Sequence, residues 1–262
     1  MKSAVILFPG TNCEKETKHV MDYVGLKADI VRWNEPEDKL GKYSSYVLPG
    51  GWSYEDRVRA GVIAAKGRIM EFLKQADREG KPILGICNGC QILIEAGLVP
   101  GLGIERVEMA LAPNINPKVS GYYCTWVRLK KEHDCAFTRK IRQHEIIQMP
   151  IAHGEGRFVT QNREVLEGLK KNRQIVFLYC DERGQAIDQF PVNPNSSVMN
   201  IAGVCNRRGN VLAIMPHPER ASFRRQLRLN PMESFEQAET KAPAIKIFES
   251  MKTYLGDEDG QI

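Results

Sequence analysis

Residues 82–97 read PILGICNGCQILIEAG, a stretch in which one apolar run meets a glycine-flanked cysteine and a second apolar run follows. The short apolar segment Pro82–Ile86 predicts a buried strand, and Asn88–Ala96 predicts a helix that ends before a glycine. Cys87 therefore stands where a strand passes directly into a helix. The spacing of Cys87 and Cys90 has three common meanings: a redox pair, half of a zinc site, or a nucleophile with an incidental neighbour.

Short apolar runs alternate with helical patterns on the N-terminal side of this stretch. The alternation predicts a parallel sheet that is covered by helices on both faces. Right-handed crossovers narrow the prediction to an α/β fold with a doubly wound sheet. The segments are three predicted strands, Ser3–Phe8, Ala28–Trp33 and Tyr46–Leu48, and two predicted helices, Asn12–Val24, with Asn12 as its cap, and Ile63–Ala76.

The second half of the chain has a different pattern, which predicts additional antiparallel or mixed strands. Ala244–Leu255 predicts an amphipathic closing helix, and the tail Gly256–Ile262 is expected to be disordered. With no internal repeat or linker, residues 1–262 are expected to form a single domain with a mostly parallel sheet. The predicted strands of this half are Tyr123–Leu129, Glu145–Ile151, Gln174–Tyr179, Asn200–Asn206 and Val211–Met215.

Composition excludes several classes of function. The chain has 262 residues and a net charge of +5, and its excess of basic residues is spread along the chain, so a solvated surface is expected and no nucleic-acid partner. Its seven cysteines are odd in number and irregularly spaced, which favours reduced thiols in a cytoplasmic protein. No apolar run approaches the roughly 20 residues of a membrane span. The N-terminal MKSAVILFPG predicts a strand and lacks the cleavage site of a signal peptide.

Two of the three meanings of the cysteine pair fit poorly. A structural zinc site usually needs a second close pair of ligands, and the remaining cysteines and the five histidines provide none, so no metal is expected. A thioredoxin-like pair also lies at a helix N-terminus, but usually after an early strand of a smaller domain. Such a pair would leave Gly85 and Gly89 unexplained.

The third meaning is a nucleophile elbow, in which the reactive residue occupies a tight turn between a strand and a helix. Gly85-Ile86-Cys87-Asn88-Gly89 has the pattern G-x-C-x-G, and side chains two residues before and after the nucleophile would collide in that turn. Helix N-terminal N–H groups favour the thiolate of Cys87. Cys90 then becomes a small buried hydrophobe. On this segment alone, a structural cysteine in a glycine-rich turn stays open.

A cysteine nucleophile needs a base, and the base usually needs an orienting group. The segment MPHPER, residues 215–220, follows a predicted strand and so lies at a strand's carboxyl end, where sites in parallel sheets assemble. Pro218 restricts the backbone of His217 and permits a turn that brings Glu219 back to the imidazole. The order is then nucleophile, base and orienter. The alternative is a proline-rich turn with a surface acid.

An acyl-transfer site also needs hydrogen-bond donors for the oxyanion. Elbow geometry supplies the N–H of Asn88, the residue after the nucleophile. The glycine pair Gly50-Gly51 ends the third predicted strand, and it would let backbone N–H groups approach a ligand. A plain β-turn would have the same composition.

Together these residues resemble the class I (triad) glutamine amidotransferases. That family carries a P-G-G oxyanion segment, a G-x-C-x-G-x-Q elbow and an H-P-E pair, and this chain has Pro49-Gly50-Gly51, Gly85–Gln91 and His217-Pro218-Glu219 in that order. Further motifs resemble one branch, the glutaminase subunits of phosphoribosylformylglycinamidine synthase in de novo purine biosynthesis. They are PGTNCE (9–14), GGWSYEDRVRAG (50–61), AHGEGRF (152–158), NPNSS (193–197) and MPHPER (215–220).

The resemblance implies a mechanism. Cys87 attacks the side-chain amide of glutamine, and His217, oriented by Glu219, moves the protons. Ammonia leaves as a γ-glutamyl thioester forms, and water then releases glutamate. The N–H groups of Gly51 and Asn88 are implied to stabilise the oxyanion.

The resemblance also implies residues that hold the substrate, although His153 has a second interpretation as a loop histidine satisfied by backbone. The implied substrate-binding residues are Gly50, Gln91, His153 and Gly154.

The chain lacks the G-x-x-x-x-G-K-[ST] and G-x-G-x-x-G motifs, so no cofactor is expected on it and the ammonia must be used elsewhere. The resemblance implies a separate large synthetase subunit that uses ATP and Mg²⁺, with a small third subunit. The chain departs from the pattern at Glu55, where glycine is expected, and in the tail after Ala221. A basic cluster in that region could dock a partner or form a solvated helix face: Arg220, Arg224, Arg225 and Arg228.

Three alternatives stay open at this point. The chain could be the glutaminase subunit of another ATP-dependent synthetase, or a cysteine hydrolase with a similar elbow. Against the second, hydrolases of the α/β type place the acid before the histidine, whereas here it follows. A non-enzymatic interaction subunit with a decayed site is the third, and the presence of all expected catalytic groups argues against it.

Overall fold

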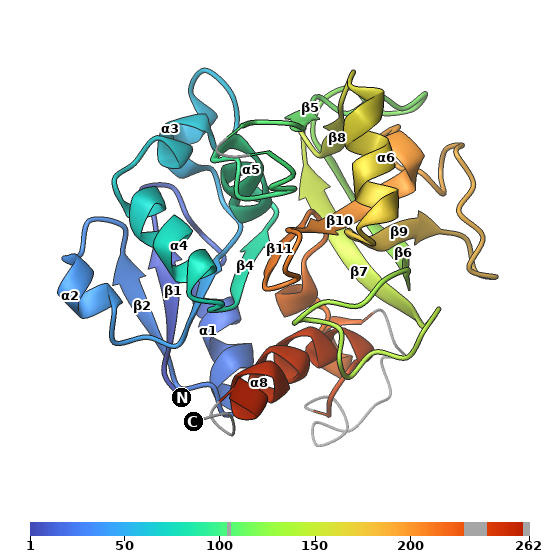
Figure 1. Cartoon of the computed structure of the whole chain (residues 1–262). Coiled ribbons are helices and arrows are strands. Elements are labelled where there is room, and N and C mark those ends of the chain that lie inside the picture. Colours follow the sequence, from blue (N-terminus) through green and yellow to red (C-terminus); the bar gives the residue numbers. More distant parts are fainter. Residues whose placement is uncertain (104–105, 228–239, 259–262) are drawn as a thin grey trace.

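The computed structural model describes residues 1–103, 106–227 and 240–258. A nine-stranded sheet of order β2-β1-β3-β4-β11-β10-β9-β6-β7 runs through the molecule (Figure 1). Its first five strands are parallel, and its remaining pairs are antiparallel. The predicted α/β class with a parallel sheet and additional antiparallel strands is therefore confirmed. In the described residues, no helix has both the length and the apolar character that a membrane span requires.

The parallel half contains the predicted N-terminal strands and one strand from the end of the chain. The segments β3, β4 and β11 are buried along their whole length, as the continuous apolar runs predict. Strand β11 inserts beside β4 and so brings a late segment next to the elbow. The strands are β1 (Ser3–Leu7), β2 (Ala28–Arg32), β3 (Ser45–Leu48), β4 (Ile83–Ile86) and β11 (Val211–Ile214).

Helices cover both faces of this half. The connection from β1 to β2 and the connection from β3 to β4 run in opposite directions across the sheet, so right-handed crossovers put their helices on opposite faces. Figure 1 shows α4 in front of the parallel strands, and α1 packs against β1 and β2. The helices are α1 (Glu14–Tyr23), α2 (Glu37–Leu40), α3 (Val62–Ala65), α4 (Ile69–Arg78) and α5 (Asn88–Glu95).

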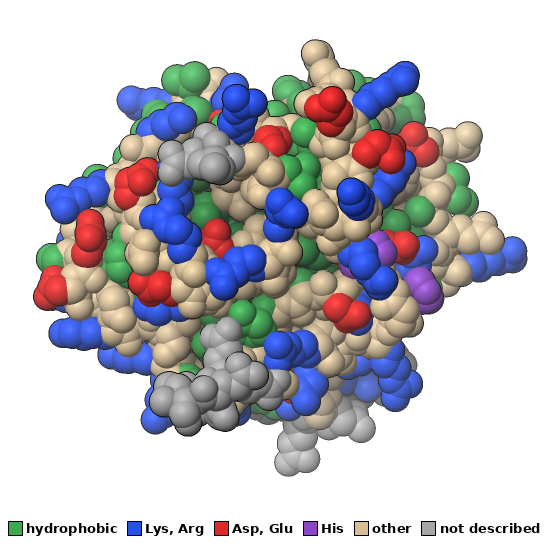
Figure 2. All heavy atoms as spheres, in the orientation of Figure 1, with side chains coloured by type: hydrophobic (Ala, Val, Ile, Leu, Met, Phe, Trp, Pro, Cys, Tyr) green, Lys and Arg blue, Asp and Glu red, His purple; other side chains and the backbone are tan. Residues whose placement is uncertain are grey.

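The antiparallel half extends the same sheet, and a two-stranded sheet of β5 and β8 accompanies it. Strands β10 and β11 pair antiparallel across a short turn. The elements of this half are β5 (Ala110–Ala112), β6 (Tyr123–Lys131), β7 (Ile146–His153), β8 (Arg157–Val159), α6 (Arg163–Lys171), β9 (Ile175–Cys180), β10 (Ile201–Cys205) and α8 (Lys246–Glu258). Short 3₁₀ segments lie at 53–56, 198–200, 218–220, 224–226 and 243–245. Figure 2 shows basic side chains scattered over one face of the molecule among acidic ones, in keeping with a solvated surface.

The structure corrects several predicted boundaries. The predicted helix Ile63–Ala76 is two helices, α3 and α4, because the chain turns around Gly67, a poor helix former. Cys13, not Asn12, occupies the N-cap position of helix α1, and its side chain makes no capping hydrogen bond. Helix α8 continues to Glu258, so the start of the predicted disordered tail is helical, and residues 259–262 lie outside the described part of the chain. The short elements α2, β5, β8 and α6 were not predicted.

The two glycines of the elbow are needed for close packing between β3, β4 and α5. A Cβ atom on Gly89 would lie 1.9 Å from the carbonyl oxygen of Leu48, and one on Gly85 would lie 2.5 Å from the carbonyl oxygen of Gly89. Both obstacles are backbone atoms in buried elements, so neither can move aside cheaply. The helix can therefore approach the sheet only with hydrogen at both positions.

We expect Gly89→Ala to lower the free energy of unfolding by about 1–3 kcal/mol or more, because the added methyl group overlaps the backbone of β3. Urea denaturation followed by circular dichroism measures the change. Gly256→Ala in α8 is the matched control: its Cβ would meet only the end of the Met1 side chain, at 3.6 Å. Equal unfolding midpoints for the two variants would contradict the packing argument.

Candidate active site

Cys87 lies at a strained turn between β4 and α5. Its backbone angles are φ 50° and ψ −105°, in a region that non-glycine residues rarely adopt. Its N–H donates to the carbonyl of Ile214 (2.8 Å), which ties the turn to β11. The thiol is only 5% exposed, and its Sγ lies 3.6 Å from the carbonyl oxygen of Ala152 in β7. Strain of this kind costs on the order of 1–3 kcal/mol and is concentrated at functional sites.

His217 and Glu219 form a buried hydrogen-bonded pair just after β11. The imidazole Nδ1 lies 2.6 Å from Oε1 of Glu219, and the two side chains are 2% and 0% exposed. Pro218 starts a 3₁₀ turn that folds the carboxylate back, as the sequence predicts. The N–H of His217 donates to the carbonyl of Pro150 (2.9 Å), which fixes the base to β7. No hydrogen-bond partner lies at Nε2 in the described structure.

The charge state of His217 is set by opposing effects. Burial favours the neutral imidazole, but the carboxylate of Glu219 and the thiol of Cys87 outweigh it and hold the pKa of His217 well above its usual value. A protonated imidazole beside Cys87 favours the thiolate. The imidazole is therefore expected to carry a proton that it can donate beside the sulfur of Cys87.

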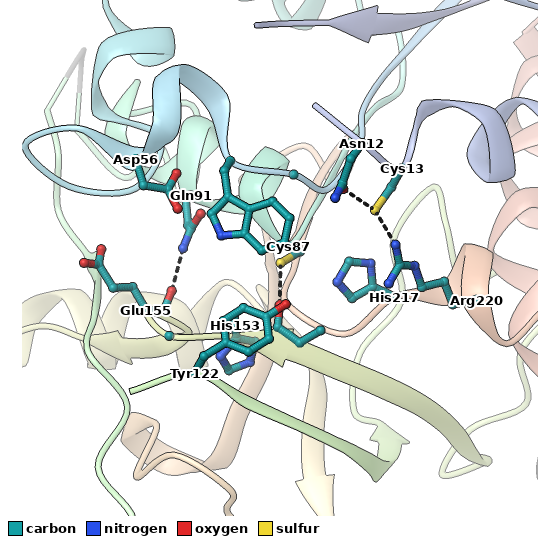
Figure 3. A pocket seen from close by; sticks show the side chains of 14 residues that line it. Asn12, Cys13, Asp56, Cys87, Gln91, Tyr122, His153, Glu155, His217 and Arg220 are labelled. Carbon is teal, nitrogen blue, oxygen red and sulfur yellow. Dashed lines mark hydrogen bonds between the residues drawn. The ribbon is translucent and has the colours of Figure 1, made fainter. Parts of the chain in front are cut away.

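A cavity of about 200 Å³ brings the predicted nucleophile and base together (Figure 3). Its lining comes from the segments after β1, β3, β4 and β11, from the end of β7 with the turn that follows it, and from the residue before β6. It is lined by Asn12, Cys13, Gly51, Trp52, Asp56, Cys87, Gln91, Tyr122, Ala152, His153, Gly154, Glu155, His217 and Arg220.

Of the two predicted oxyanion donors, Gly51 lines this cavity, and Asn88 follows Cys87 at the start of α5. The N–H of Asn88 belongs to the first residue of α5, where N–H groups have no intrahelical acceptor. Gly51 lines the cavity, and its Cβ would lie 2.6 Å from both Gly10 O and Thr11 Cα, so only glycine fits. Gly50 lies behind the base instead: a Cβ there would be 2.8 Å from Cε1 of His217.

The other predicted substrate-binding residues hold one another in place. Gln91 accepts a hydrogen bond from the side chain of Asn88 (2.9 Å) and donates one to the carbonyl of Glu155 (2.6 Å), so both ends of its amide are engaged. His153 is fully buried, with Nδ1 3.1 Å from Oδ1 of Asn114. Burial lowers the pKa of His153 to about 3, so the ring is neutral. The second interpretation of His153 expected a loop histidine hydrogen-bonded to backbone. Its Nδ1 is instead hydrogen-bonded to a side chain.

Comparisons with known proteins agree with this geometry. A family model described as a CobB/CobQ-like glutamine amidotransferase domain matches residues 1–255. The PurQ subunit of phosphoribosylformylglycinamidine synthase from Methanothrix thermoacetophila is 48% identical, over 97% of this chain and 98% of that protein. Its counterpart from Pyrococcus furiosus is 46% identical, over 85% of this chain and 90% of that protein.

The chain belongs to the PurQ family of glutamine amidotransferases. A solved structure of PurLQS from Thermotoga maritima contains a chain that is 32% identical, with a TM-score of 0.72 over 97% of this chain and 98% of that one. The resemblance inferred from the motifs is thereby confirmed, and the chain is an enzyme with glutaminase activity of this class.

The amidotransferase site includes residues that the sequence did not single out. Cys13 lies close to His217 and Glu219, and Arg220 donates to its sulfur (3.1 Å) while also bonding Glu16 (3.0 Å). The PGTNCE motif contains Cys13 but gives no sign of its partner. Trp52 stacks on Tyr122 at 6.0 Å between ring centroids, and both line the cavity. The acidic residues Asp56 and Glu155 also line the cavity.

One group of the described residues offers metal-ligating atoms. Atoms of Cys13, His217 and Glu219 lie within 4.8 Å of one another. Glu219 and His217 are already hydrogen-bonded to each other, and Arg220 donates to Cys13. The group is therefore accounted for by contacts within the amidotransferase itself.

Two features that were left open in the sequence have definite places. Glu55 lies in a left-handed conformation (φ 61°), which explains why glycine is the expected residue there. Arg220 lines the cavity from the 3₁₀ turn after His217, and it bonds Cys13 and Glu16 there. Arg224 and Arg225 follow in a 3₁₀ segment, and Arg228 lies outside the described residues.

We expect Glu219→Gln to lower the pKa of His217, because the charge that opposes the burial effect is removed. Less thiolate then forms at neutral pH, and kcat for glutamine hydrolysis should fall about 10²-fold or more. Titration of the imidazole by NMR and the rate of Cys87 alkylation against pH measure the change. Glu16→Gln, which changes one partner of Arg220 and keeps the His217–Glu219 pair, should leave both nearly unchanged. An unaltered His217 titration in Glu219→Gln would refute the assignment.

Proposed function

We propose that this chain is the glutaminase subunit of a phosphoribosylformylglycinamidine synthase. It hydrolyses glutamine to glutamate and ammonia and passes the ammonia to an ATP-dependent synthetase subunit in de novo purine biosynthesis. The observation that supports this most directly is a cavity where Cys87 on a strained elbow meets the buried His217–Glu219 pair, in a chain of the PurQ family.

In the proposed mechanism, the sulfur of Cys87 attacks the amide carbon of the glutamine side chain, and the N–H groups of Gly51 and Asn88 bind the oxyanion. His217 then gives its proton to the leaving nitrogen, the C–N bond breaks, and ammonia departs from a γ-glutamyl thioester. The neutral imidazole next takes a proton from water, whose oxygen attacks the thioester. Collapse of the second intermediate releases glutamate and restores the thiol.

Gln91, Gly50, His153 and Gly154 have narrower proposed roles. We propose that Gln91 and Gly154 shape the wall against which the glutamyl group rests, since Gln91 bonds the carbonyl of Glu155 in the adjoining loop. His153 contributes through its backbone, because its ring is bonded to Asn114. Gly50 acts indirectly, by leaving space for the imidazole of His217.

The proposal assigns the ATP-dependent step to other subunits. A PurL-type synthetase would use ATP and Mg²⁺ and receive the ammonia, with a PurS-type small subunit as a third component. The related chain from Thermotoga maritima belongs to a PurLQS structure, which supports this arrangement. The chain itself would need no metal or cofactor, because a thiol, an imidazole and backbone donors suffice for amide hydrolysis. Its free cysteines favour the cytoplasm as its compartment.

We expect Cys87→Ala to abolish glutamine hydrolysis and Cys90→Ser to leave most of it intact. Cys87 lines the cavity, whereas Cys90, a residue of α5, is fully buried and does not line it. Glutamate release should be measured in the complex with the synthetase subunits, because a partner can complete such a site. Equal loss from both changes would overturn the assignment of Cys87 as nucleophile and favour a redox pair.

The acceptor of the ammonia is tested separately. Purification of the tagged chain from its own cell extract, with identification of the bound proteins, should recover a synthetase of the purine pathway. Recovery of a different ATP-dependent synthetase would keep the glutaminase chemistry and replace the pathway.

A further inference from the structure

Two residues of the cavity have no part in the proposed hydrolysis, although they lie against its base. Cys13 comes from the segment after β1, and Arg220 ends the 3₁₀ turn that follows His217. Figure 3 shows both beside His217, on one side of Cys87. The sulfur of Cys13 lies within 4.8 Å of ligating atoms of both His217 and Glu219. A thiol and a cation thus surround the catalytic pair on the side away from the nucleophile's helix.

We propose that Arg220 is a positioning residue, whose fixed positive charge keeps Glu219 ionised while His217 is neutral. The inference rests on the proposed function and concerns its second half, the hydrolysis of the thioester. There the oxygen of water attacks the thioester carbon and one of its protons passes to the neutral imidazole. The C–S bond then breaks, the sulfur leaves with the electron pair, and the proton is shared again between sulfur and imidazole. Arg220 contacts none of these reacting atoms and acts through Glu219.

Glu219 needs such a charge because it is fully buried. Its side chain is 0% exposed, and its Oε2 has no hydrogen-bond partner in the described structure. A buried carboxylate is costly unless a positive group is paired with it. Protonated His217 is one such group, since its Nδ1 lies 2.6 Å from Oε1 of Glu219. When the imidazole is neutral, the ion-pair partner that remains in the described part of the chain is Arg220, whose Nε lies 3.9 Å from the same oxygen.

Arg220 is held at this distance by contacts on two sides. Its Nη2 donates to the sulfur of Cys13 (3.1 Å) and to Oε1 of Glu16 in α1 (3.0 Å). The thiol of Cys13, which is buried, donates in turn to Oδ1 of Asn12 (3.2 Å). An arginine keeps its charge at every pH at which the enzyme works, whereas an imidazole does not. The guanidinium therefore stays beside Glu219 in both protonation states of the base.

The other charged and titratable groups around the base supply no second cation while the thioester exists. The groups that face His217 or line its cavity are Cys13, Asp56, Cys87, Tyr122, His153, Glu155, Glu219 and Arg220. Burial lowers the pKa of His153 to about 3, so that ring is neutral. Burial raises the pKa of the Cys13 thiol and the pKa of Tyr122, which keeps both uncharged. The sulfur of Cys87 is then part of the thioester, and the remaining carboxylates can only add negative charge.

The test removes the charge with Arg220→Gln, in the complex with the synthetase subunits. The His217–Glu219 pair should then hold a proton more tightly, because no nearby positive charge opposes it. The acid limb of the kcat profile for glutamine hydrolysis should move up by about one pH unit, and kcat on that limb should fall about 10-fold. This shift is opposite in direction to the one expected for Glu219→Gln.

The same variant should separate the two halves of the reaction. Formation of the thioester uses the protonated imidazole and should be spared, so ammonia should appear in a burst before a slow steady state. The γ-glutamyl thioester should accumulate, because its hydrolysis needs the neutral imidazole. Acid quenching after mixing with radiolabelled glutamine measures the label on the protein. A residue with a merely structural role would move neither the burst nor the acid limb.

Three further variants identify the charge as the cause. Arg220→Lys keeps the charge and should keep most of the wild-type profile. Cys13→Ala removes one anchor of the guanidinium and should move the acid limb in the same direction as Arg220→Gln, by a smaller amount. Arg68→Gln is the matched control, because it removes the same charge from a side chain that is 89% exposed and does not line the cavity. Its profile should match that of the wild type.

The outcomes separate this inference from the proposed function. If the wild-type complex releases no glutamate from glutamine, the proposed function fails. If it does so and Arg220→Gln lowers kcat equally at every pH without accumulating thioester, the inference is wrong. An Arg220→Lys profile that matches Arg220→Gln would also overturn it, because the charge would then not be the cause. Should Arg220→Gln fail to fold, an unmoved acid limb in Cys13→Ala contradicts the proposal by itself.

Discussion

The backbone of Cys87 is the constraint on which the rest of the site depends. Its left-handed conformation directs the thiol into the cavity and lets α5 begin at the next residue. The turn is possible only because Gly85 and Gly89 have no Cβ atom. A Cβ at either position would overlap backbone atoms of α5 or β3. Its strain, on the order of 1–3 kcal/mol, is offset by burial of β4 and α5 on both sides. A nucleophile held this way needs no reorganisation before it reacts.

Strand order then decides which groups surround the sulfur. Strand β4 lies between β3 and β11, so the segment after β3 brings Gly51 and the segment after β11 brings His217. Each proposed catalytic group thus comes from a neighbour of the nucleophile's own strand. The antiparallel half completes the arrangement, because Pro150 in β7 accepts from the N–H of His217 and Ala152 lies against the thiol. The site therefore depends on both halves of the sheet.

The sequence predicts the features that are encoded locally. The elbow and the turn at His217–Glu219 are local in the sequence, since glycine spacing and proline restriction act within a few residues. The split of Ile63–Ala76 was missed because its apolar stripe continues across the break. Strands β5 and β8 have three residues each, too few to show the alternation of apolar and polar residues that predicts a strand. The direction of the His153 ring depends on Asn114, 39 residues away. Such distant contacts leave no local signal.

The cysteines near the elbow show why residue type alone could not identify the nucleophile. Burial, followed by the charge of Cys87, holds the pKa of the Cys90 thiol well above its usual value, so Cys90 stays protonated within the helix. Burial also raises the pKa of Cys13, whose sulfur lies close to His217 and Glu219. Cys87 differs from both by standing at a helix N-terminus and lining the cavity with an imidazole whose Nε2 is unpartnered in the described structure. Backbone position, fixed by two glycines, is what distinguishes one thiol from chemically identical neighbours.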